Sequence, residues 1–295
     1  MKNKKNLIVI ITTKGLNQNL KKVYKSLILQ KYKPKKIIIS SCNKLSNFFK
    51  CEIVYSSVNN QVYQRSKALK KLKLKKKDIL LFLDDKIILD KNCLFELNEE
   101  WNSSKKNVAG IGLSCVNYSP PKVNFVQRVT HTNTSEPGKI LKNGFVSGYG
   151  NLKKNIKVDW LNGGMTSWKY NYVKNYLSRN YPLINWSVGE DLIFSYNISK
   201  KYDLIVSKRS KCKIILSNKK KNFKESFSVG YYHSFIVKSF IKANIKNFSI
   251  LLYYYSIISS SIIGISLNLL IFNIKEVFRY SGRIFGSLSY FKNIK

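Results

Sequence analysis

The chain has 295 residues, a length that suits one large α/β domain with an appendage, or two small domains. Hydrophobic residues make up 44% of it, enough for a full core, which argues against a globally disordered protein. The formal net charge of +38 points to a polyanionic partner, either nucleic acid or an anionic membrane.

The excess charge comes almost entirely from lysine, in a chain also crowded with asparagine, isoleucine, tyrosine and phenylalanine. All five have AT-rich codons, so a nucleotide bias explains part of the charge. Aromatic residues do not interleave with the lysine runs, which disfavours nucleic acid and favours an anionic membrane surface as partner. Five cysteines without a CxxC pair and two distant histidines indicate a cytosolic compartment and argue against a zinc site.

In the first part of the chain, apolar runs alternate with helical patterns. Strands are predicted at Leu7–Ile11, Ile37–Ile39, Ile53–Tyr55 and Ile79–Leu83, and helices at Leu20–Ile28 and Val62–Leu72. This alternation predicts parallel crossovers in an open sheet, where ligands gather beyond the carboxyl ends of the strands. Two pairs of residues, Thr12 with Thr13 and Asp84 with Asp85, lie at that edge.

The following segments complete the predicted sheet domain. We expect helices at Cys93–Trp101, Lys169–Leu177 and Glu190–Lys200, and strands at Val108–Cys115, Val158–Leu161, Leu204–Val206 and Ile214–Leu216. The residues from Asn117 to Asn155 are rich in asparagine, serine, glycine and proline, and predict a long loop that is functional or mobile.

The composition changes after Lys246. No charged residue occurs from Asn247 to Ile274, a stretch long enough to cross a bilayer as a helix, although a helix buried in the protein core is the alternative. Basic residues flank both sides, so charge does not select an orientation. We therefore predict a sheet domain over residues 1–215 and a helical, membrane-associating region over residues 216–295. Its apolar segment, about 248–273, either spans the membrane or lies in the interface.

Three short motifs can carry chemistry. Adjacent carboxylates at Asp84 and Asp85 repel each other unless a cation such as Mg²⁺ or Mn²⁺ is present, although a solvated turn is the simpler interpretation. Glu190 and Asp191 open a helix, where acidic residues are also favoured by the helix dipole alone. Gly163 and Gly164 let a backbone approach a ligand closely, or form an ordinary turn. The neighbouring Trp160 can stack on a sugar or belong to the core.

The order of these motifs resembles that of the family 2 glycosyltransferases, which have the nucleotide-binding GT-A fold. The resemblance covers about Leu7 to Val206. It implies an α/β fold with an open mixed sheet, Rossmann-like, and helices on both faces. Four segments carry it: Val9–Thr13 with the helix through Ser26, Leu27 and Gln30; Gln64–Ser66 before Leu81–Asp85; Trp160–Gly164; and Glu190–Asp191.

On the side of the nucleotide-sugar donor, the resemblance implies that Thr12 and Thr13 line the base pocket and that Arg65 lies close to the nucleotide. It also implies that Asp84 contacts the ribose and that Asp85 ligates Mg²⁺ or Mn²⁺ at the diphosphate.

On the side of the acceptor, the resemblance implies that Asp191 is the general base and that Glu190 orients the site. Trp160, Gly163 and Gly164 would lie under the acceptor.

Two positions depart from the family pattern. The second strand is followed by Ser40, Ser41 and Cys42 instead of an acidic residue that recognises the base. Lys86 stands where many members have a third carboxylate, which weakens the metal assignment. Its cation would either face a phosphate of the donor or point away.

These observations predict an inverting glycosyltransferase at the cytoplasmic face of a membrane. It would transfer a sugar from a nucleotide donor to a hydroxyl of a lipid-linked or polysaccharide acceptor, in the synthesis of a surface glycan such as O-antigen or capsule. The alternative is a non-catalytic GT-A-fold protein that binds sugar nucleotide or serves as a membrane-bound scaffold.

Overall fold

The computed structural model describes residues 5–174, 189–216 and 222–289. It divides into two compact units, each formed from two stretches of the chain. The first, here called the sheet unit, comprises Met1–Pro120 and Tyr149–Leu216. The second, the helical unit, comprises Pro121–Gly148 and Ser217–Lys295.

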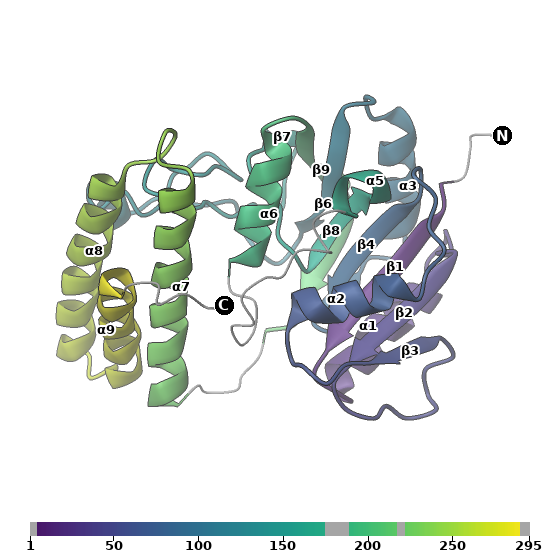
Figure 1. The fold of residues 1–295 in the computed structure, drawn as a ribbon, viewed down its shortest axis with the longest axis horizontal. Helices are drawn as coiled ribbons and strands as arrows, with labels where there is room; N and C mark the ends of the chain where they lie inside the picture. The colour runs from purple at the N-terminus through teal and green to yellow at the C-terminus, as the bar shows by residue number, and fades with distance from the viewer. Residues whose placement is uncertain (1–4, 175–188, 217–221, 290–295) are drawn as a thin grey trace. The chain divides into compact units, whose positions relative to one another are not determined.

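The sheet unit is built around one mixed sheet, whose strands are drawn as arrows in Figure 1. Nine strands are found within the described residues: β1 (Leu7–Thr13), β2 (Lys36–Ser41), β3 (Glu52–Tyr55), β4 (Ile79–Asp84), β5 (Ile87–Leu89), β6 (Val108–Cys115), β7 (Ile156–Val158), β8 (Met165–Lys169) and β9 (Asp203–Ile214). Their order is β3-β2-β1-β4-β8-β6-β9-β5, and β7 also pairs with β9. The strands β1 to β4 are parallel to one another, whereas β8 runs antiparallel to both β4 and β6.

The central strands are the apolar runs that the sequence predicts. Every residue of β1 and β6 is buried, as is β4 up to its last residue, Asp84. Strands buried on both faces read as continuous hydrophobic runs, which is why these strands are evident from sequence. The register places Thr12 of β1 beside both Ser40 of β2 and Asp84 of β4, so Thr12 and Asp84 lie at the same edge of the sheet, as predicted.

Helices flank this sheet: α1 (Gln18–Ile28), α2 (Gln61–Lys70), α3 (Cys93–Ser103), α5 (Tyr170–Val173) and α6 (Glu190–Ser199). Asparagine caps start the first two, because the side chain of Asn17 accepts from the amide of Leu20 and that of Asn60 from the amide of Tyr63. Figure 1 shows α2 passing across the strands near β1 and β4.

Several parts of the sheet differ from the sequence prediction. Strand β5 was not predicted, and the short strand expected at Val158–Leu161 is β7, which ends at Val158. The two strands expected at Leu204–Val206 and Ile214–Leu216 are replaced by one long strand, β9, which contains Leu204–Val206, ends at Ile214 and has irregularities in its pairing with β6. Strand β8 was not predicted, because its sequence has no alternating pattern. It fits because Gly110 of β6 leaves room for the ring of Trp168: an added Cβ there would lie 2.6 Å from that ring. Of the helix predicted at Lys169–Leu177, Lys169 belongs to β8 and Tyr170–Val173 form α5, while residues 175–177 lie outside the described residues.

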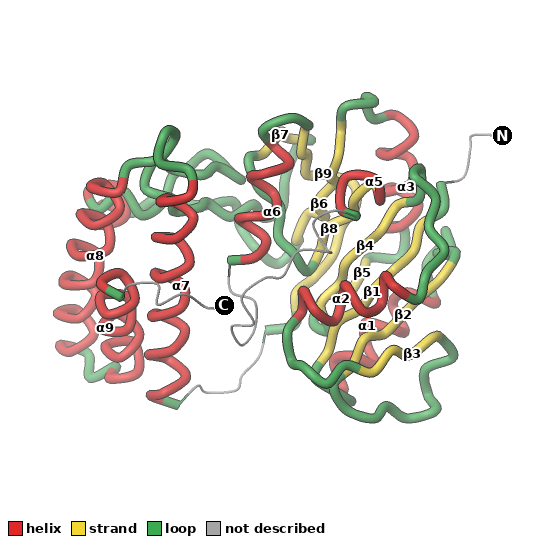
Figure 2. The backbone as a smooth tube through the Cα atoms, in the orientation of Figure 1, coloured by secondary structure: helices red, strands yellow, loops and turns green. Residues whose placement is uncertain are grey.

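The helical unit contains α4 (Phe125–Val129), α7 (Phe223–Ala243), α8 (Ile250–Leu270) and α9 (Ile274–Leu288). Figure 2 shows the three long helices side by side. The segment Pro121–Gly148, predicted as a loop of the sheet domain, packs with these helices instead, so the observed division differs there from the predicted boundary at 215/216. Asn143 Nδ2 donates to Ser256 Oγ at 2.6 Å, and the amide of Ser249 donates to the carbonyl of Lys142 at 2.7 Å.

Glycines bring α7 and α9 into backbone contact. A Cβ added at Gly230 of α7 would lie 2.0 Å from the carbonyl oxygen of Arg279. On α9, an added Cβ would lie 2.2 Å from the carbonyl oxygen of Phe227 at Gly282, and 2.1 Å from that of Tyr231 at Gly286. Gly282 and Gly286 form a GxxxG pattern, which permits close helix approach.

We predict that Gly286→Ala destabilises the protein by about 1–3 kcal/mol, because the new methyl group meets backbone that cannot move aside. Alanine at an exposed helix position would instead stabilise it, so the sign of the change is informative. Thermal or urea unfolding measures the effect. Gly148→Ala in the same unit is the control, since no atom lies within 4 Å of its added Cβ. Equal stability of the two variants would contradict the close contact between α7 and α9.

Candidate active site

The glycine loop is fastened to the end of β4. The amide of Asp84 donates to the carbonyl oxygen of Gly164 at 2.9 Å, and the amide of Gly164 donates to Asn162 Oδ1 at 3.0 Å. A Cβ added at Gly164 would lie 2.2 Å from Asp84 Cγ, so a larger residue would displace the carboxylate. Gly164 is therefore required by the close approach of loop and carboxylate, as paired glycines suggest.

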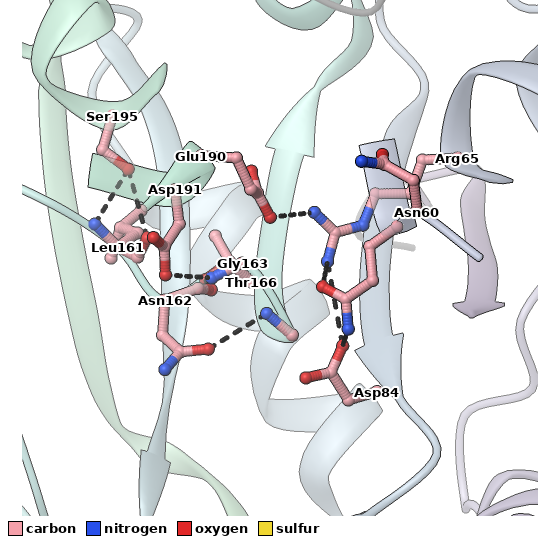
Figure 3. A network of polar contacts seen from close by, with 12 residues as sticks. Asn60, Arg65, Asp84, Leu161, Asn162, Gly163, Thr166, Glu190, Asp191 and Ser195 are labelled. Atoms are coloured by element: carbon pink, nitrogen blue, oxygen red, sulfur yellow. Dashed lines mark hydrogen bonds and ion pairs between the residues drawn. The ribbon is translucent and has the colours of Figure 1, made fainter. Parts of the chain in front are cut away.

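The second acidic pair faces the same loop. Helix α6 starts at Gly189, whose φ of 72° is in the left-handed region that favours glycine. Glu190 and Asp191 then occupy the first helical turn. The amide of Gly163 donates to Asp191 Oδ2 at 3.3 Å, and a Cβ added at Gly163 would lie 2.7 Å from Glu190 Oε1. The loop thus contacts Asp84 on one side and the pair of Glu190 and Asp191 on the other (Figure 3).

Arg65 of α2 links the two acidic pairs. Its Nη1 donates to Glu190 Oε1 at 2.7 Å, and its Nη2 lies 3.8 Å from Asp84 Oδ1. Gln61, one helical turn earlier, accepts from Arg65 Nη2 at 3.3 Å and donates to Asp84 Oδ1 at 3.1 Å. The guanidinium also lies 5.1 Å from the ring of Phe82. Figure 3 shows Arg65 between the carboxylates of Glu190 and Asp84.

The site raises the pKa of two of its carboxylates. Burial, followed by the charge of Glu190, raises the pKa of Asp191 to about 7, although amides of Gly163 and Leu192 and the charge of Arg65 oppose the shift. Burial also raises the pKa of Asp84, and Arg65 opposes that shift. Burial lowers the pKa of Arg65, but Glu190 and Asp84 raise it by more, so Arg65 stays a cation. Asp191 is thus suited to exchange a proton near neutral pH.

A second cluster lies at the outer end of β1 and β4. Thr13 Oγ1 donates to Asp85 Oδ2 at 2.6 Å, and Asn17 Nδ2 donates to the same oxygen at 3.0 Å. The side chain of Asp85 is half-buried, and the next residue, Lys86, is exposed. Thr12 is 3% exposed, and its hydroxyl has no hydrogen-bond partner within the described part of the chain.

The residues at the ends of β1 and β4 suit a metal ion only if substrate phosphates supply some of its ligands. The described residues contain no group of three or more histidine, cysteine, aspartate or glutamate side chains that could hold an ion. Mg²⁺, however, is commonly bound by one or two carboxylates together with substrate phosphates and water. Asp85, oriented by Thr13 and Asn17, provides one such carboxylate. The donor set therefore suits an ion that binds together with a diphosphate.

Trp160 is buried within the sheet unit. It is 8% exposed, and its ring centroid lies 6.0 Å from that of Tyr149. Tyr149 Oη in turn accepts from the amide of Asn162 at 2.7 Å, and Ser195 Oγ accepts from the amide of Leu161 at 3.0 Å. These two hydrogen bonds hold the backbone of the glycine loop in place. They come from Tyr149 and Ser195, which the sequence analysis did not identify.

The structure thus brings together six of the predicted site residues in one network: Arg65, Asp84, Gly163, Gly164, Glu190 and Asp191. Thr13 and Asp85 form the neighbouring cluster, whereas Thr12 and Trp160 are buried: Thr12 pairs with Asp84 in the register of β1 and β4, and the ring of Trp160 lies against that of Tyr149. Gln61 was missed, although its position four residues before Arg65 on one helix face was a usable signal. No local sequence pattern identifies Tyr149 and Ser195 as residues that hold the loop.

We predict that Arg65→Met destabilises the protein by about 3–5 kcal/mol, because it leaves Glu190 buried without its cation. Adding Glu190→Gln removes the buried negative charge that faced Arg65, so the double variant should be more stable than Arg65→Met alone. Urea unfolding of the four proteins completes the cycle. As a control, Lys157→Met removes a surface partner of Asp203 and should cost about 1 kcal/mol or less. A double variant whose loss equals the sum of the single losses would contradict the coupling.

Comparison with known proteins bears on the fold. No family model matches the chain, and no curated protein sequence matches it. Among solved structures, the mannosyltransferase PcManGT of Pyrobaculum calidifontis, in complex with GDP-Man and Mn²⁺, superposes with a TM-score of 0.55 at 9% identity, over 97% of this chain and 87% of that one. TarS 1–349 of S. aureus gives 0.51 at 10% identity, over 95% and 90%. GalNAc-T7 with UDP, GalNAc and Mn²⁺ gives 0.52 at 13% identity, over 72% and 43%. The chain therefore has the GT-A glycosyltransferase fold.

Proposed function

We propose that the protein is an inverting glycosyltransferase, which moves a sugar from a nucleotide-sugar donor to a hydroxyl group of a glycan acceptor. One observation carries the proposal. Asp84 at the end of β4 and the pair of Glu190 and Asp191 at the start of α6 lie on two sides of one glycine loop, and Arg65 joins Asp84 to Glu190. A donor and an acceptor hydroxyl can then be held together between carboxylates that have different surroundings.

The donor would bind at the ends of β1 and β4. Asp84 would contact the ribose, while Arg65 and Gln61 hold its carboxylate in place. Asp85, oriented by Thr13 and Asn17, would hold a Mg²⁺ or Mn²⁺ ion at the diphosphate. Such an ion supplies Lewis-acid stabilisation of the charge on the leaving diphosphate. The complexes of PcManGT with GDP-Man and Mn²⁺, and of GalNAc-T7 with UDP, GalNAc and Mn²⁺, support this assignment.

Asp191 would act as the general base. Its carboxylate takes the proton of the acceptor hydroxyl, whose oxygen forms a bond to the anomeric carbon while the bond from that carbon to the diphosphate breaks. Attack from the face opposite the leaving group inverts the configuration. Both oxygens of Asp191 accept backbone amides, from Gly163 and Leu192, which fixes the carboxylate for proton transfer. Glu190, held by Arg65, fixes the start of the helix that carries it.

We further propose that the acceptor is lipid-linked or a growing polysaccharide of a surface glycan, O-antigen-like or capsule-like, at the cytoplasmic face of a membrane. Within the described residues, α8 is long and apolar enough to cross a membrane by length and composition. The net charge of +38 suits an anionic bilayer surface. Both features support a location of the protein at a membrane surface.

We predict that a matching nucleotide sugar raises the unfolding temperature in the presence of Mn²⁺, since ligand at about 100 times its Kd stabilises a protein by about 2.7 kcal/mol. A thermal-shift screen of nucleotide sugars with Mn²⁺ or with EDTA tests this. Asp85→Asn should abolish the dependence on Mn²⁺. Stabilisation that EDTA leaves fully intact would contradict the metal assignment and would point to Lys86 as the cation that faces the diphosphate.

We predict that Asp191→Asn lowers the transfer rate by about 10²–10⁴-fold, the usual contribution of a general base, while donor-induced stabilisation persists. The wild-type rate should fall as the pH drops through about 7, because Asp191 must be ionised to accept a proton and its pKa is raised to about 7. Above that pH the rate should level off. Initial rates with the donor identified by the screen provide the measurement.

Transfer that survives Asp191→Asn unchanged would contradict the role of Asp191 as general base, whereas donor-induced stabilisation without any transfer by the wild type would favour the alternative, a non-catalytic GT-A-fold protein that binds sugar nucleotide. Unchanged donor-induced stabilisation in the variant controls for folding and for the integrity of the donor site.

A further inference from the structure

The end of the helical unit where α8 turns into α9 exposes a cluster of large apolar side chains, here called the apolar tip. Its members are Leu267, Leu269, Leu270, Ile271, Phe272 and Ile274. Leu270 is 76% exposed and Phe272 86%. Single exposed apolar residues are ordinary, but a contiguous exposed group marks a surface that contacts another molecule or a membrane.

The first turn of α7 lies at the same end of the unit. The ring of Phe223, in that turn, is 5.2 Å from the ring of Phe278 of α9, and both side chains are exposed. Lys224, next in the chain, is exposed as well. Apolar and basic side chains therefore occur together at this end, as in segments that lie at a membrane interface.

The charge of the helical unit indicates which kind of partner contacts the apolar tip. Its two stretches contain sixteen lysine and arginine residues but three glutamates. A second copy of the chain would bring an equally positive unit against the tip, at a cost in repulsion. An anionic bilayer offers the opposite charge, worth about 1 kcal/mol for each basic residue near its surface, together with hydrocarbon for the tip.

The packing of α9 argues against a transmembrane position of α8. The two helices run antiparallel along each other: Gly264 of α8 lies against the ring of Tyr280, and Tyr254 Oη donates to the carbonyl oxygen of Ser287 at 3.5 Å. Between those contacts α9 carries Arg283. A spanning α8 would draw that arginine into the hydrocarbon, where charged side chains are costly.

We propose that the apolar tip dips into one leaflet of an anionic bilayer, so that the chain is held at the interface and α8 does not cross the membrane. This inference rests on the membrane contact included in the proposed function and specifies where and how it occurs. Amphipathic segments of this kind bury their apolar side chains about 5–10 Å into the interface. The apolar tip together with the basic residues of the unit, and not the length of α8, would then determine binding.

The test is flotation of the full chain with vesicles of pure phosphatidylcholine, or of phosphatidylcholine with about one-third phosphatidylglycerol. The wild type should bind the anionic vesicles at least tenfold more tightly than the neutral ones. Phe272→Glu should weaken that binding at least tenfold, and Leu270→Glu should reproduce the loss. Leu251→Glu, at the opposite end of α8 and 80% exposed, is the matched control and should bind like the wild type.

Ile258→Glu, on the exposed side of α8 and away from both ends, separates the two membrane arrangements. Loss of binding in this variant and in Leu251→Glu, as large as in Phe272→Glu, would overturn the tip in favour of a helix that spans the membrane or lies flat in it. Equal binding to neutral and anionic vesicles would overturn the role of charge. A wild type that binds neither kind of vesicle would overturn the inference altogether, while donor-induced stabilisation and the effect of Asp191→Asn would still report on sugar transfer. Unfolding temperatures of the variants verify that each is folded.

Discussion

A buried guanidinium group determines the geometry of the candidate site. Arg65 is 3% exposed, and a charge removed from water in this way requires partners of opposite sign. It finds them in Glu190, 125 residues later in the chain, and in Asp84. Because Gly163 and Gly164 have no side chains, the loop between these acids can approach both. Arg65 thereby connects three elements, namely helix α2, strand β4 and helix α6.

The same contact gives the two acidic pairs different chemistry. Glu190 is paired with the cation, whereas Asp191 points to the backbone of the loop and to its own helix. Burial with a neighbouring negative charge raises the pKa of Asp191, and this is the condition for a carboxylate that accepts a proton near neutral pH. Asp85 is held by a threonine and an asparagine, so it stays available to an ion at the edge of the sheet.

Much of this could be predicted from sequence, because β1, β4 and β6 are buried on both faces and appear as uninterrupted apolar runs. The acidic pairs and the glycine loop were evident as motifs, and their order indicated the fold. The partner of Arg65 could not be predicted, since its distance along the chain leaves no local signal. Strand β8 lacks an alternating pattern, and Pro121–Gly148 carries no mark of its packing against α8. Those features depend on tertiary contacts.

The central claim is that one ligand site lies between the carboxylates of Asp85 and Asp191. A crystal structure of the protein with Mn²⁺ and the nucleotide sugar that stabilises it most would test this directly. Our account predicts the diphosphate and the ion at Asp85, with the anomeric carbon of the sugar turned toward Asp191 and room for a hydroxyl between them. A nucleotide bound elsewhere on the sheet unit, or a sugar separated from Asp191 by packed side chains, would contradict it.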